Sequence, residues 1–252
     1  MLSKLGVVMV GLSIALPAAA QDGGTPDPKD TEVWTPEPAR VVPGSTSRAP
    51  SDALVLFDGK DAREWVSAAA PGKAAGWIVA DGALTVRGGS GDIQTRRTFT
   101  DYQLHLEWRV PARLTGSGQG RGNSGLFLST GTGNGYELQI LDCGDNQTYV
   151  NGQAASIYKQ YAPLVNACAA AGEWQTYDVI WTAPRFGDDG ALLSPAHVTA
   201  LHNGVLVQNH VALRGESLHA GKPAYRKHGP APIKLQDHGD AVSFRNIWVR
   251  PL

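Results

Sequence analysis

The sequence predicts an all-β protein built as a sandwich of two stacked antiparallel sheets. From residue 53 onward, short apolar runs alternate with turns rich in Gly, Asp and Asn, which is the spacing of an all-β sandwich or barrel. No long segment has a helical period, and only 151–161 fits a short helix. About a dozen strands without long helices favour two sheets packed face to face.

The segment 102–110 gives the clearest strand. Every second residue there is Tyr, Leu, Trp or Val, and the residues between them are Gln, His, Glu and Arg. Because side chains alternate between the two faces of a strand, one face should lie in the core and the other in water. Asp81-Gly82 and Asn203-Gly204 separate neighbouring apolar runs and accept positive φ, so both predict hairpins.

The other strands are shorter and are expected at 53–57, 77–80, 83–86, 91–96, 124–128, 136–141, 174–181, 198–202, 205–208, 233–236 and 242–249. Two long polar segments, 182–196 and 214–230, interrupt them. Loops of this length in a compact domain are often functional. The second segment contains two histidines and could line a site, although a solvated surface loop explains it more simply.

The N-terminus predicts export. Residues 1–20 hold one cation, Lys4, then an apolar run over 5–16, Pro17 and three alanines, which is the pattern of a cleaved signal peptide. The apolar run is too short to span a bilayer, so no membrane anchor should remain after cleavage. Residues 21–50 are rich in Pro, Thr and Ser and read as a linker or arm, which leaves 51–252 as the folded domain. We therefore expect a periplasmic or secreted bacterial protein.

Charge and cysteine content exclude several functions. The 22 Lys and Arg nearly balance the 23 Asp and Glu, and no basic stripe is present, so nucleic acid is not an expected partner. Cys143 and Cys168 could form a disulfide in an exported protein or remain as thiols, and they do not make a zinc site. No cofactor is expected to be required; a structural calcium is possible, but no acidic loop has convincing ligand spacing. Gly120–Gly125 matches G-x-G-x-x-G, yet an apolar run follows it instead of a helix, which excludes a dinucleotide site.

The segment 136–142, Tyr-Glu-Leu-Gln-Ile-Leu-Asp, is the strongest candidate for chemistry. Glu137 and Gln139 should project from one face of a strand, roughly 7 Å apart. Asp142 should emerge on the opposite face unless a bulge turns it round, and bulges are common beside active sites. Carboxyl and amide groups on an open sheet face suit sugar hydroxyls, and two carboxyls could share acid and base work. An ordinary solvated strand explains the pattern equally well.

The order of short motifs along the chain resembles the 3-keto-disaccharide hydrolase domain family. The motifs are Leu56-Phe57-Asp58-Gly59-Lys60, Gly122-Asn123-Ser124-Gly125, Tyr136 to Asp142, Gly172-Glu173-Trp174, Leu235-Gln236-Asp237-His238-Gly239 and Phe244-Arg245-Asn246-Ile247. The resemblance covers nearly all of 52–252. It implies a concanavalin A-like jelly roll that acts on disaccharides oxidised to a ketone at carbon 3 of one sugar. The segment 137–142 also resembles the E-x-D-x-x-E strand of laminarinases and lichenases, from which it departs at Gln139 and Asp142.

A keto sugar changes the chemistry that the site must provide. A carbonyl at carbon 3 acidifies the proton on carbon 2, so a base can remove that proton and the glycosidic oxygen can leave carbon 1 by elimination. Water then adds back. We expect Glu137 and Asp142 to do the acid and base work, with His238 as an alternative base. The side chains expected to bind sugar hydroxyls or the enolate are Asn123, Gln139, Lys234 and Gln236; no metal ligands are expected.

Three other functions fit the same sequence. The domain could be a non-catalytic carbohydrate-binding module, since many lectins share this architecture. It could be an ordinary glycosidase of unoxidised glycans, or a scaffold with a vestigial site. Loss of a carboxylate would abolish turnover in an enzyme but would only weaken binding in a module.

Overall fold

The computed structural model describes residues 25–45, 48–131 and 133–252. The chain divides into two units, Met1–Arg40 and Val41–Leu252. The expected signal peptide, 1–20, lies outside the described residues. The first unit contains a short 3-10 helix, η1 (Pro28–Thr31), and its apolar side chains Val33 and Trp34 are exposed. No helix in the described part of the chain is long and apolar enough to cross a membrane.

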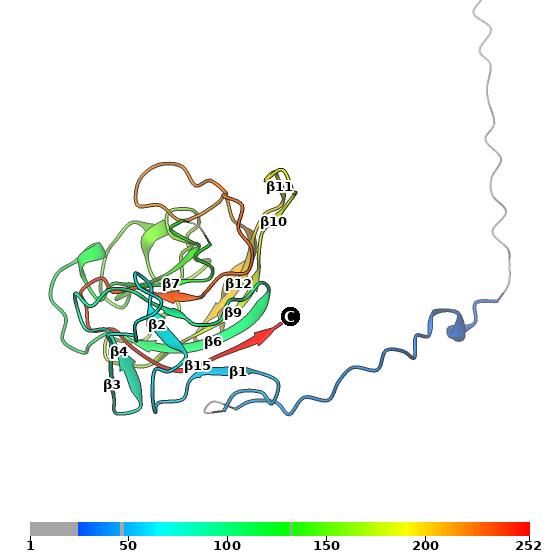
Figure 1. Ribbon diagram of the computed structural model, residues 1–252, viewed down its shortest axis with the longest axis horizontal. Helices are drawn as coiled ribbons and strands as arrows, with labels where there is room; N and C mark the ends of the chain where they lie inside the picture. The colour runs from blue at the N-terminus through cyan, green and yellow to red at the C-terminus, as the bar shows by residue number, and fades with distance from the viewer. Residues whose placement is uncertain (1–24, 46–47, 132) are drawn as a thin grey trace, which may run out of the picture. The chain divides into compact units, whose positions relative to one another are not determined.

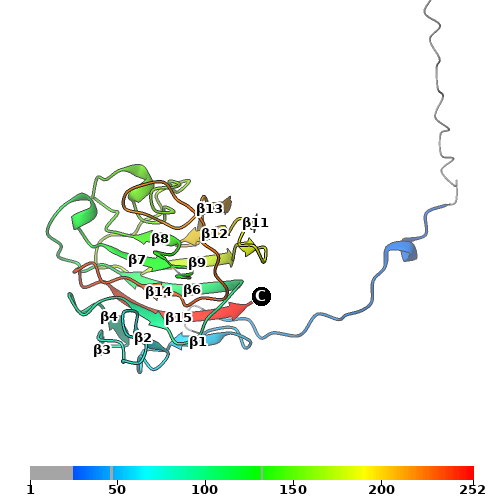
Figure 2. The ribbon, with the colours of Figure 1, turned by 45° about the horizontal axis from the view of Figure 1, so that its top comes forward.

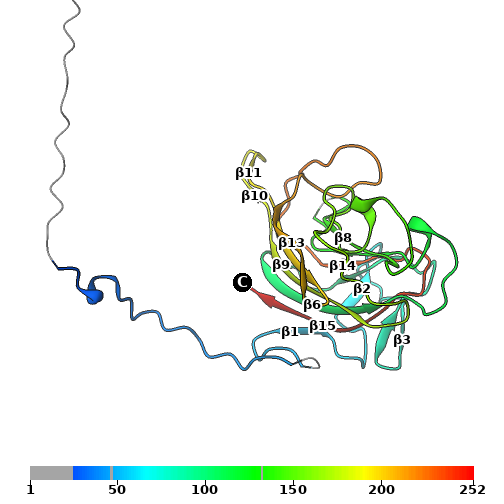
Figure 3. The same ribbon diagram turned by 180° about the vertical axis from the view of Figure 1, so that it is seen from behind.

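The second unit is an all-β jelly-roll sandwich of two antiparallel sheets, as the sequence predicts (Figures 1 and 2). The larger sheet has eight strands in the order β13-β12-β9-β6-β15-β4-β3, with β1 also paired to β15. Their bounds are β1 (Leu54–Phe57), β3 (Ile78–Ala80), β4 (Ala83–Thr85), β6 (Tyr102–Arg109), β9 (Gln175–Thr182), β12 (His197–His202), β13 (Val205–Ala212) and β15 (Ser243–Pro251). Figure 3 shows its long central strands side by side.

The smaller sheet has five strands in the order β2-β5-β14-β7-β8. Their bounds are β2 (Trp65–Ser67), β5 (Ile93–Thr95), β7 (Ser124–Phe127), β8 (Glu137–Ile140) and β14 (Lys234–Leu235). The strands β7, β8 and β14 thus belong to one layer of the sandwich, and β6, β9 and β15 belong to the other. A separate hairpin, β10 (Arg185–Phe186) with β11 (Leu192–Ser194), projects from one end (Figure 1). Two 3-10 turns, η2 (Gly118–Gly120) and η3 (Val150–Gly152), lie in the connecting loops.

The core lies between the two layers. From the larger sheet, the apolar face of β6 is fully buried, as its alternation predicts, and so are Tyr177 and Trp181 of β9. From the smaller sheet, Leu126, Leu138 and Ile140 point into the same core. Because these residues alternate with polar ones, burying them turns their neighbours on β7, β8 and β14 away from the core.

Both predicted hairpin turns are present. Asp81-Gly82 joins β3 to β4 and Asn203-Gly204 joins β12 to β13, and all four residues have positive φ. Such φ values match the right-handed twist of the paired strands. The turns therefore fix the register of two strand pairs in the larger sheet.

The predicted helix at 151–161 is wrong. After η3 the chain forms turns, and Ala155 and Lys159 both have positive φ, which no α-helix accommodates. The short strands β2, β10 and β11 are not among those that the sequence predicts. Segment 182–196, expected as a loop, contains the β10–β11 hairpin.

Cys143 and Cys168 form a disulfide with a Cα–Cα distance of 5.9 Å, which settles the alternative that the sequence left open. The bond closes a segment of 25 residues that contains η3, Tyr149 and Tyr158. This segment has little regular secondary structure among its described residues. The disulfide therefore stabilises a part of the domain that has few strand hydrogen bonds.

Replacing both cysteines by alanine should lower the free energy of unfolding by about 3 kcal/mol, because the open segment gains conformational entropy in the unfolded chain. Urea unfolding of the oxidised protein and of the double variant measures the difference. Adding a reductant should produce the same shift in the unchanged protein and none in the variant. Equal midpoints for both proteins would contradict this role.

Candidate active site

A polar pocket of about 320 Å³ lies on the face of the smaller sheet that points away from the core. The strands β7, β8 and β14 and the residues that follow β14 supply its floor through Phe127, Glu137, Gln139, Lys234, Gln236 and His238. Loops supply its walls through Gln119, Asn123, Asn134, Tyr158, Ser217 and His219. Glu137 and Gln139 thus share one face, as the strand period predicts, while Leu138 and Ile140 point into the core.

Strand register arranges the floor in two rows. Lys234 pairs with Phe127 and Phe127 with Glu137, so these three side chains lie side by side across β14, β7 and β8. In the next row Gly125 pairs with Gln139, and the Gln236 N–H donates to the Gly125 carbonyl at 3.0 Å. Gly125 therefore occupies the middle of the second row without a side chain.

Glu137 is the buried carboxyl of this floor. Its side chain is 6% exposed, and among the described residues no cation forms an ion pair with it. Loss of hydration raises the pKa of Glu137 to about 8; the Lys234 ammonium opposes this shift and the Asp92 carboxylate adds to it. At neutral pH Glu137 is therefore mostly a protonated carboxylic acid, able to donate a proton inside the pocket.

Lys234 provides positive charge beside Glu137. Its ammonium lies 2.7 Å from Asp92 Oδ2 and 3.9 Å from the centre of the Phe127 ring. Asp92 also accepts the Asp237 N–H at 2.9 Å, so this carboxylate joins β5 to the segment that follows β14. The ammonium is thereby fixed in position and retains further N–H donors for a ligand.

Gln119, which sequence reasoning did not select, organises one wall. Its side-chain amide donates to the Gly152 carbonyl at 2.7 Å and to Thr148 Oγ1 at 3.0 Å, and its Oε1 accepts from Gln139 Nε2 at 3.0 Å. Its backbone carbonyl accepts from Asn123 Nδ2 at 2.7 Å. Since the Gly152 carbonyl can only accept, the orientation of the Gln119 amide is determined, and the Gln139 amide must present its nitrogen.

We expect Gln119→Leu to lower the free energy of unfolding by about 1–3 kcal/mol, because it leaves buried hydrogen-bonding groups of Gln139 and Gly152 without partners. Gln119→Glu is the informative companion, since a carboxylate can accept from Gln139 but cannot donate to Gly152. Both variants should unfold at lower urea concentration than the unchanged protein. Stability unaffected by either replacement would show that the Gln119 bonds do not hold this wall.

The opposite wall comes from segment 214–230 and from the segment closed by the Cys143–Cys168 disulfide. Ser217 Oγ accepts the Glu137 N–H at 3.1 Å, which attaches segment 214–230 to β8. The Tyr158 hydroxyl lies 2.8 Å from that of Tyr149 and 3.4 Å from His219 Nδ1. Burial, the Tyr149 hydrogen bond and the nearby Glu137 raise the pKa of Tyr158. Segment 214–230, which the sequence favoured as a solvated loop, therefore lines the pocket through Ser217 and His219.

Six of the seven expected site residues line this pocket, and Asp142 does not. Asp142 is 3% exposed, and its Oδ2 lies 2.5 Å from Arg121 Nε. Its Cβ lies against the loop at Gly122, which also approaches the core residue Val110. The structure thus places the two carboxyls in different surroundings: Glu137 in the pocket, and Asp142 in an ion pair that anchors the loop before β7.

The described residues contain no side-chain grouping of the kind that binds metal ions. Across 25–45, 48–131 and 133–252, no group of three or more His, Cys, Asp or Glu side chains lies close enough together to hold a metal ion. The pocket residues themselves are mainly amides, aromatic rings and hydroxyls. The amides and hydroxyls can form hydrogen bonds with a ligand, and Glu137 and His238 can transfer protons.

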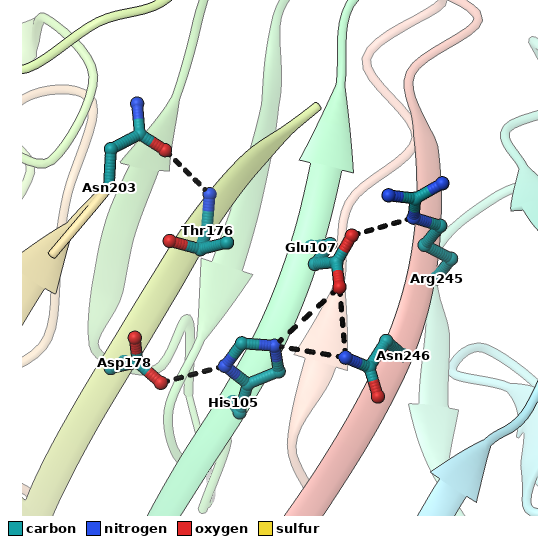
Figure 4. A network of polar contacts seen from close by, with 7 residues as sticks. All are labelled: His105, Glu107, Thr176, Asp178, Asn203, Arg245 and Asn246. Atoms are coloured by element: carbon teal, nitrogen blue, oxygen red, sulfur yellow. Dashed lines mark hydrogen bonds and ion pairs between the residues drawn. The ribbon is translucent and has the colours of Figure 1, made fainter. Parts of the chain in front are cut away.

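A second polar network lies on the larger sheet, on the face of β6 that the sequence predicted to be wet (Figure 4). Glu107 is only 6% exposed; it accepts from Arg245 Nε at 2.6 Å and from Asn246 Nδ2 at 2.9 Å. His105 Nδ1 lies 2.7 Å from Asp178 Oδ1. These groups pair across β9, β6 and β15, so the network joins strands of the larger sheet, whereas the pocket belongs to the smaller one.

A polar pocket on the outer face of a jelly-roll sheet, with amide, hydroxyl and carboxyl groups around it, is a site suited to hydroxyl-rich ligands such as sugars. Comparison with known protein families agrees with a sugar-binding site. The model of the 3-keto-alpha-glucoside-1,2-lyase-like domain matches residues 52–250, and the chain belongs to this family.

Individual relatives have related names. A 3-keto-disaccharide hydrolase of Bacteroides thetaiotaomicron is 25% identical over 238 residues, which cover 79% of this chain and 78% of the relative. A candidate glycosyl hydrolase of Parabacteroides distasonis, solved by crystallography, is 48% identical with a TM-score of 0.84, over 90% of this chain and 97% of that one. A second such protein of the same organism is 21% identical with a TM-score of 0.59, over 79% and 94%, and shows the fold alone.

Proposed function

We propose that the protein cleaves 3-keto-glycosides, disaccharides in particular, in the pocket of the smaller sheet. The observation that carries this proposal is the burial of the Glu137 carboxyl at the pocket floor, which raises its pKa to about 8 and favours the protonated acid at neutral pH. An acid in this state can protonate a leaving glycosidic oxygen. Membership of the 3-keto-alpha-glucoside-1,2-lyase-like family supports the choice of an oxidised sugar.

The proposed first step is an elimination. His238, an exposed imidazole at the edge of the pocket, takes the proton from carbon 2, and the electrons of that bond form a carbon 1–carbon 2 double bond. Glu137 gives its proton to the oxygen that leaves carbon 1, so the departing sugar is released as an alcohol. The Lys234 ammonium and the Gln139 amide N–H stabilise the negative charge that develops on the carbon 3 oxygen.

The proposed second step returns both protons. Glu137, now a carboxylate, removes a proton from water as the oxygen of that water bonds to carbon 1. The imidazolium of His238 gives its proton back to carbon 2. The sum of the two steps is hydrolysis, and elimination alone is the lyase reaction that the family description names. This scheme gives no proton transfer to Asp142, whose carboxylate pairs with Arg121.

The test compares oxidised and unoxidised sugars. We expect release of monosaccharide from 3-keto-trehalose or 3-keto-sucrose and none from trehalose or sucrose. Glu137→Gln should slow release by about 10²–10⁴-fold, while Glu173→Gln, which changes an exposed glutamate, should preserve it. Release from the unoxidised sugars would instead indicate an ordinary glycosidase, and binding without release would indicate a carbohydrate-binding module.

We also propose that the protein is exported to the periplasm or the medium. The signal-like segment 1–20 and the Cys143–Cys168 disulfide support this location, because disulfides persist mainly in oxidising compartments. Fractionation of cells producing the full chain should find the processed protein outside the cytoplasm. Recovery of the unprocessed chain from the cytoplasm would contradict export.

A further inference from the structure

Gly125 lies on the pocket floor, where a neighbouring side chain occupies the space that a Cβ atom would need. Its backbone conformation does not itself require glycine. It lies inside β7, between Gln236 and Gln139 of the neighbouring strands. It is absent from the glycines with positive φ, so its backbone would accept any L-residue. Glycine weakens a strand interior, and where it occurs there it often marks a place that another group approaches closely.

The group that approaches is the carboxyl of Glu137. A methyl group built on Gly125 would lie 2.6 Å from Glu137 Oε1, 3.0 Å from the Phe127 ring and 3.3 Å from Gln236 Oε1. The Glu137 carboxyl therefore lies over the bare backbone of β7 instead of pointing straight out of the sheet. This position keeps the acid at the bottom of the pocket, where water has little access.

We propose that Gly125 is a positioning residue for the reaction. Because it has no side chain, the Glu137 carboxyl can lie close to the backbone of β7, at the bottom of the pocket and below the bound sugar. This inference rests on the proposed function, because it assumes that Glu137 is the acid. The nearest conflicting atom is the end of a flexible side chain, so a methyl group at Gly125 should displace the Glu137 carboxyl toward the pocket opening and leave the sheet intact.

The test is Gly125→Ala. We expect a loss of kcat of about 10²-fold, the scale that a misplacement near 1 Å can produce, with little change in KM or in the melting temperature. Gly72→Ala is the control, because Gly72 has no neighbour within 4 Å of an added methyl group and no positive φ. That variant should keep the activity of the unchanged protein.

Two further measurements distinguish displacement of the Glu137 carboxyl from a non-specific loss of activity in Gly125→Ala. A carboxyl moved toward solvent should titrate at lower pH than the buried one, so the descending limb of the pH–rate profile should shift down in Gly125→Ala. Shortening the acid removes the clash, so adding Glu137→Asp to Gly125→Ala should cost less activity than the two single losses multiplied together. Independent losses that simply multiply, with an unshifted profile, would overturn the inference.

The inference can fail separately from the proposed function. If the unchanged protein does not cleave 3-keto-disaccharides, the proposed function is wrong, and carbon-13 NMR titration of Glu137, assigned with Glu137→Gln, still reports where its carboxyl lies. A lower titration midpoint in Gly125→Ala than in the unchanged protein would support the positioning role even then. Full activity and an unchanged titration in a folded Gly125→Ala would overturn the positioning role alone.

Discussion

Glu137→Gln is expected to lower kcat/KM for a 3-keto-disaccharide by about 10²–10⁴-fold, the usual contribution of a general acid or base. Glutamine keeps the size of the side chain and cannot donate a proton to the leaving oxygen. The pH dependence of kcat/KM shows whether Glu137 acts as a general acid or as a general base. An acid must be protonated in the free enzyme, so kcat/KM should fall as pH rises through the pKa of about 8 that burial gives Glu137.

Steady-state kinetics between pH 5 and pH 10 measure this profile, with Glu173→Gln as the matched control on an exposed glutamate. Assignment of Glu137 as the base predicts the opposite limb, a rate that increases through about pH 8. Such an increase would reverse the roles of Glu137 and His238 while leaving the pocket as the site. Full activity of Glu137→Gln would remove Glu137 from the mechanism.

The same substitution should stabilise the fold at neutral and alkaline pH. The pKa of Glu137 is raised in the folded state from 4.5 to about 8, so the folded chain keeps a proton that the unfolded chain has lost. This contribution to stability is complete below pH 4.5 and is lost at about 1.4 kcal/mol per pH unit as pH rises toward 8. Glutamine does not ionise and avoids the loss, so Glu137→Gln should be more stable than the unchanged protein by roughly 3 kcal/mol at pH 7.

Urea unfolding at pH 5, 7 and 8 measures this difference, which should grow with pH and be smallest, about 1 kcal/mol, at pH 5. Asp142→Asn is the contrasting variant. It removes the acceptor of Arg121 and should destabilise the protein, because one partner of a largely buried pair is left alone. A stability difference for Glu137→Gln that does not change with pH would contradict the burial of an acid with a raised pKa.

The sequence predicted those parts of the fold that depend on local patterns. Strand β6 follows from strict alternation, and both hairpins in the larger sheet follow from Asp-Gly and Asn-Gly turns. The common face of Glu137 and Gln139 follows from the period of a strand. The structure of segment 151–161 could not be predicted from local patterns, because its turns depend on contacts with β8. In one of these contacts the Ser156 carbonyl accepts the Gln139 N–H.

The rest of the site could not be predicted because it is assembled by contacts between distant segments. Ser217 lies 80 residues from Glu137 along the chain and meets it only through a loop without regular structure. Gln119 and Tyr158 had no local signal of function, since a polar loop residue or a tyrosine has many ordinary roles. The absence of Asp142 from the pocket reflects its pairing with Arg121, which spacing along one strand does not reveal.

The central claim is that bond cleavage begins with removal of the carbon 2 proton, and solvent deuterium tests it most directly. The released 3-keto sugar should carry one deuterium at carbon 2 when turnover takes place in heavy water, because the exposed His238 exchanges the proton that it has taken. Early time points, compared with the same sugar left without enzyme and with Glu137→Gln, exclude slow spontaneous exchange. A product that retains its original hydrogen at carbon 2 would contradict elimination and favour direct displacement at carbon 1.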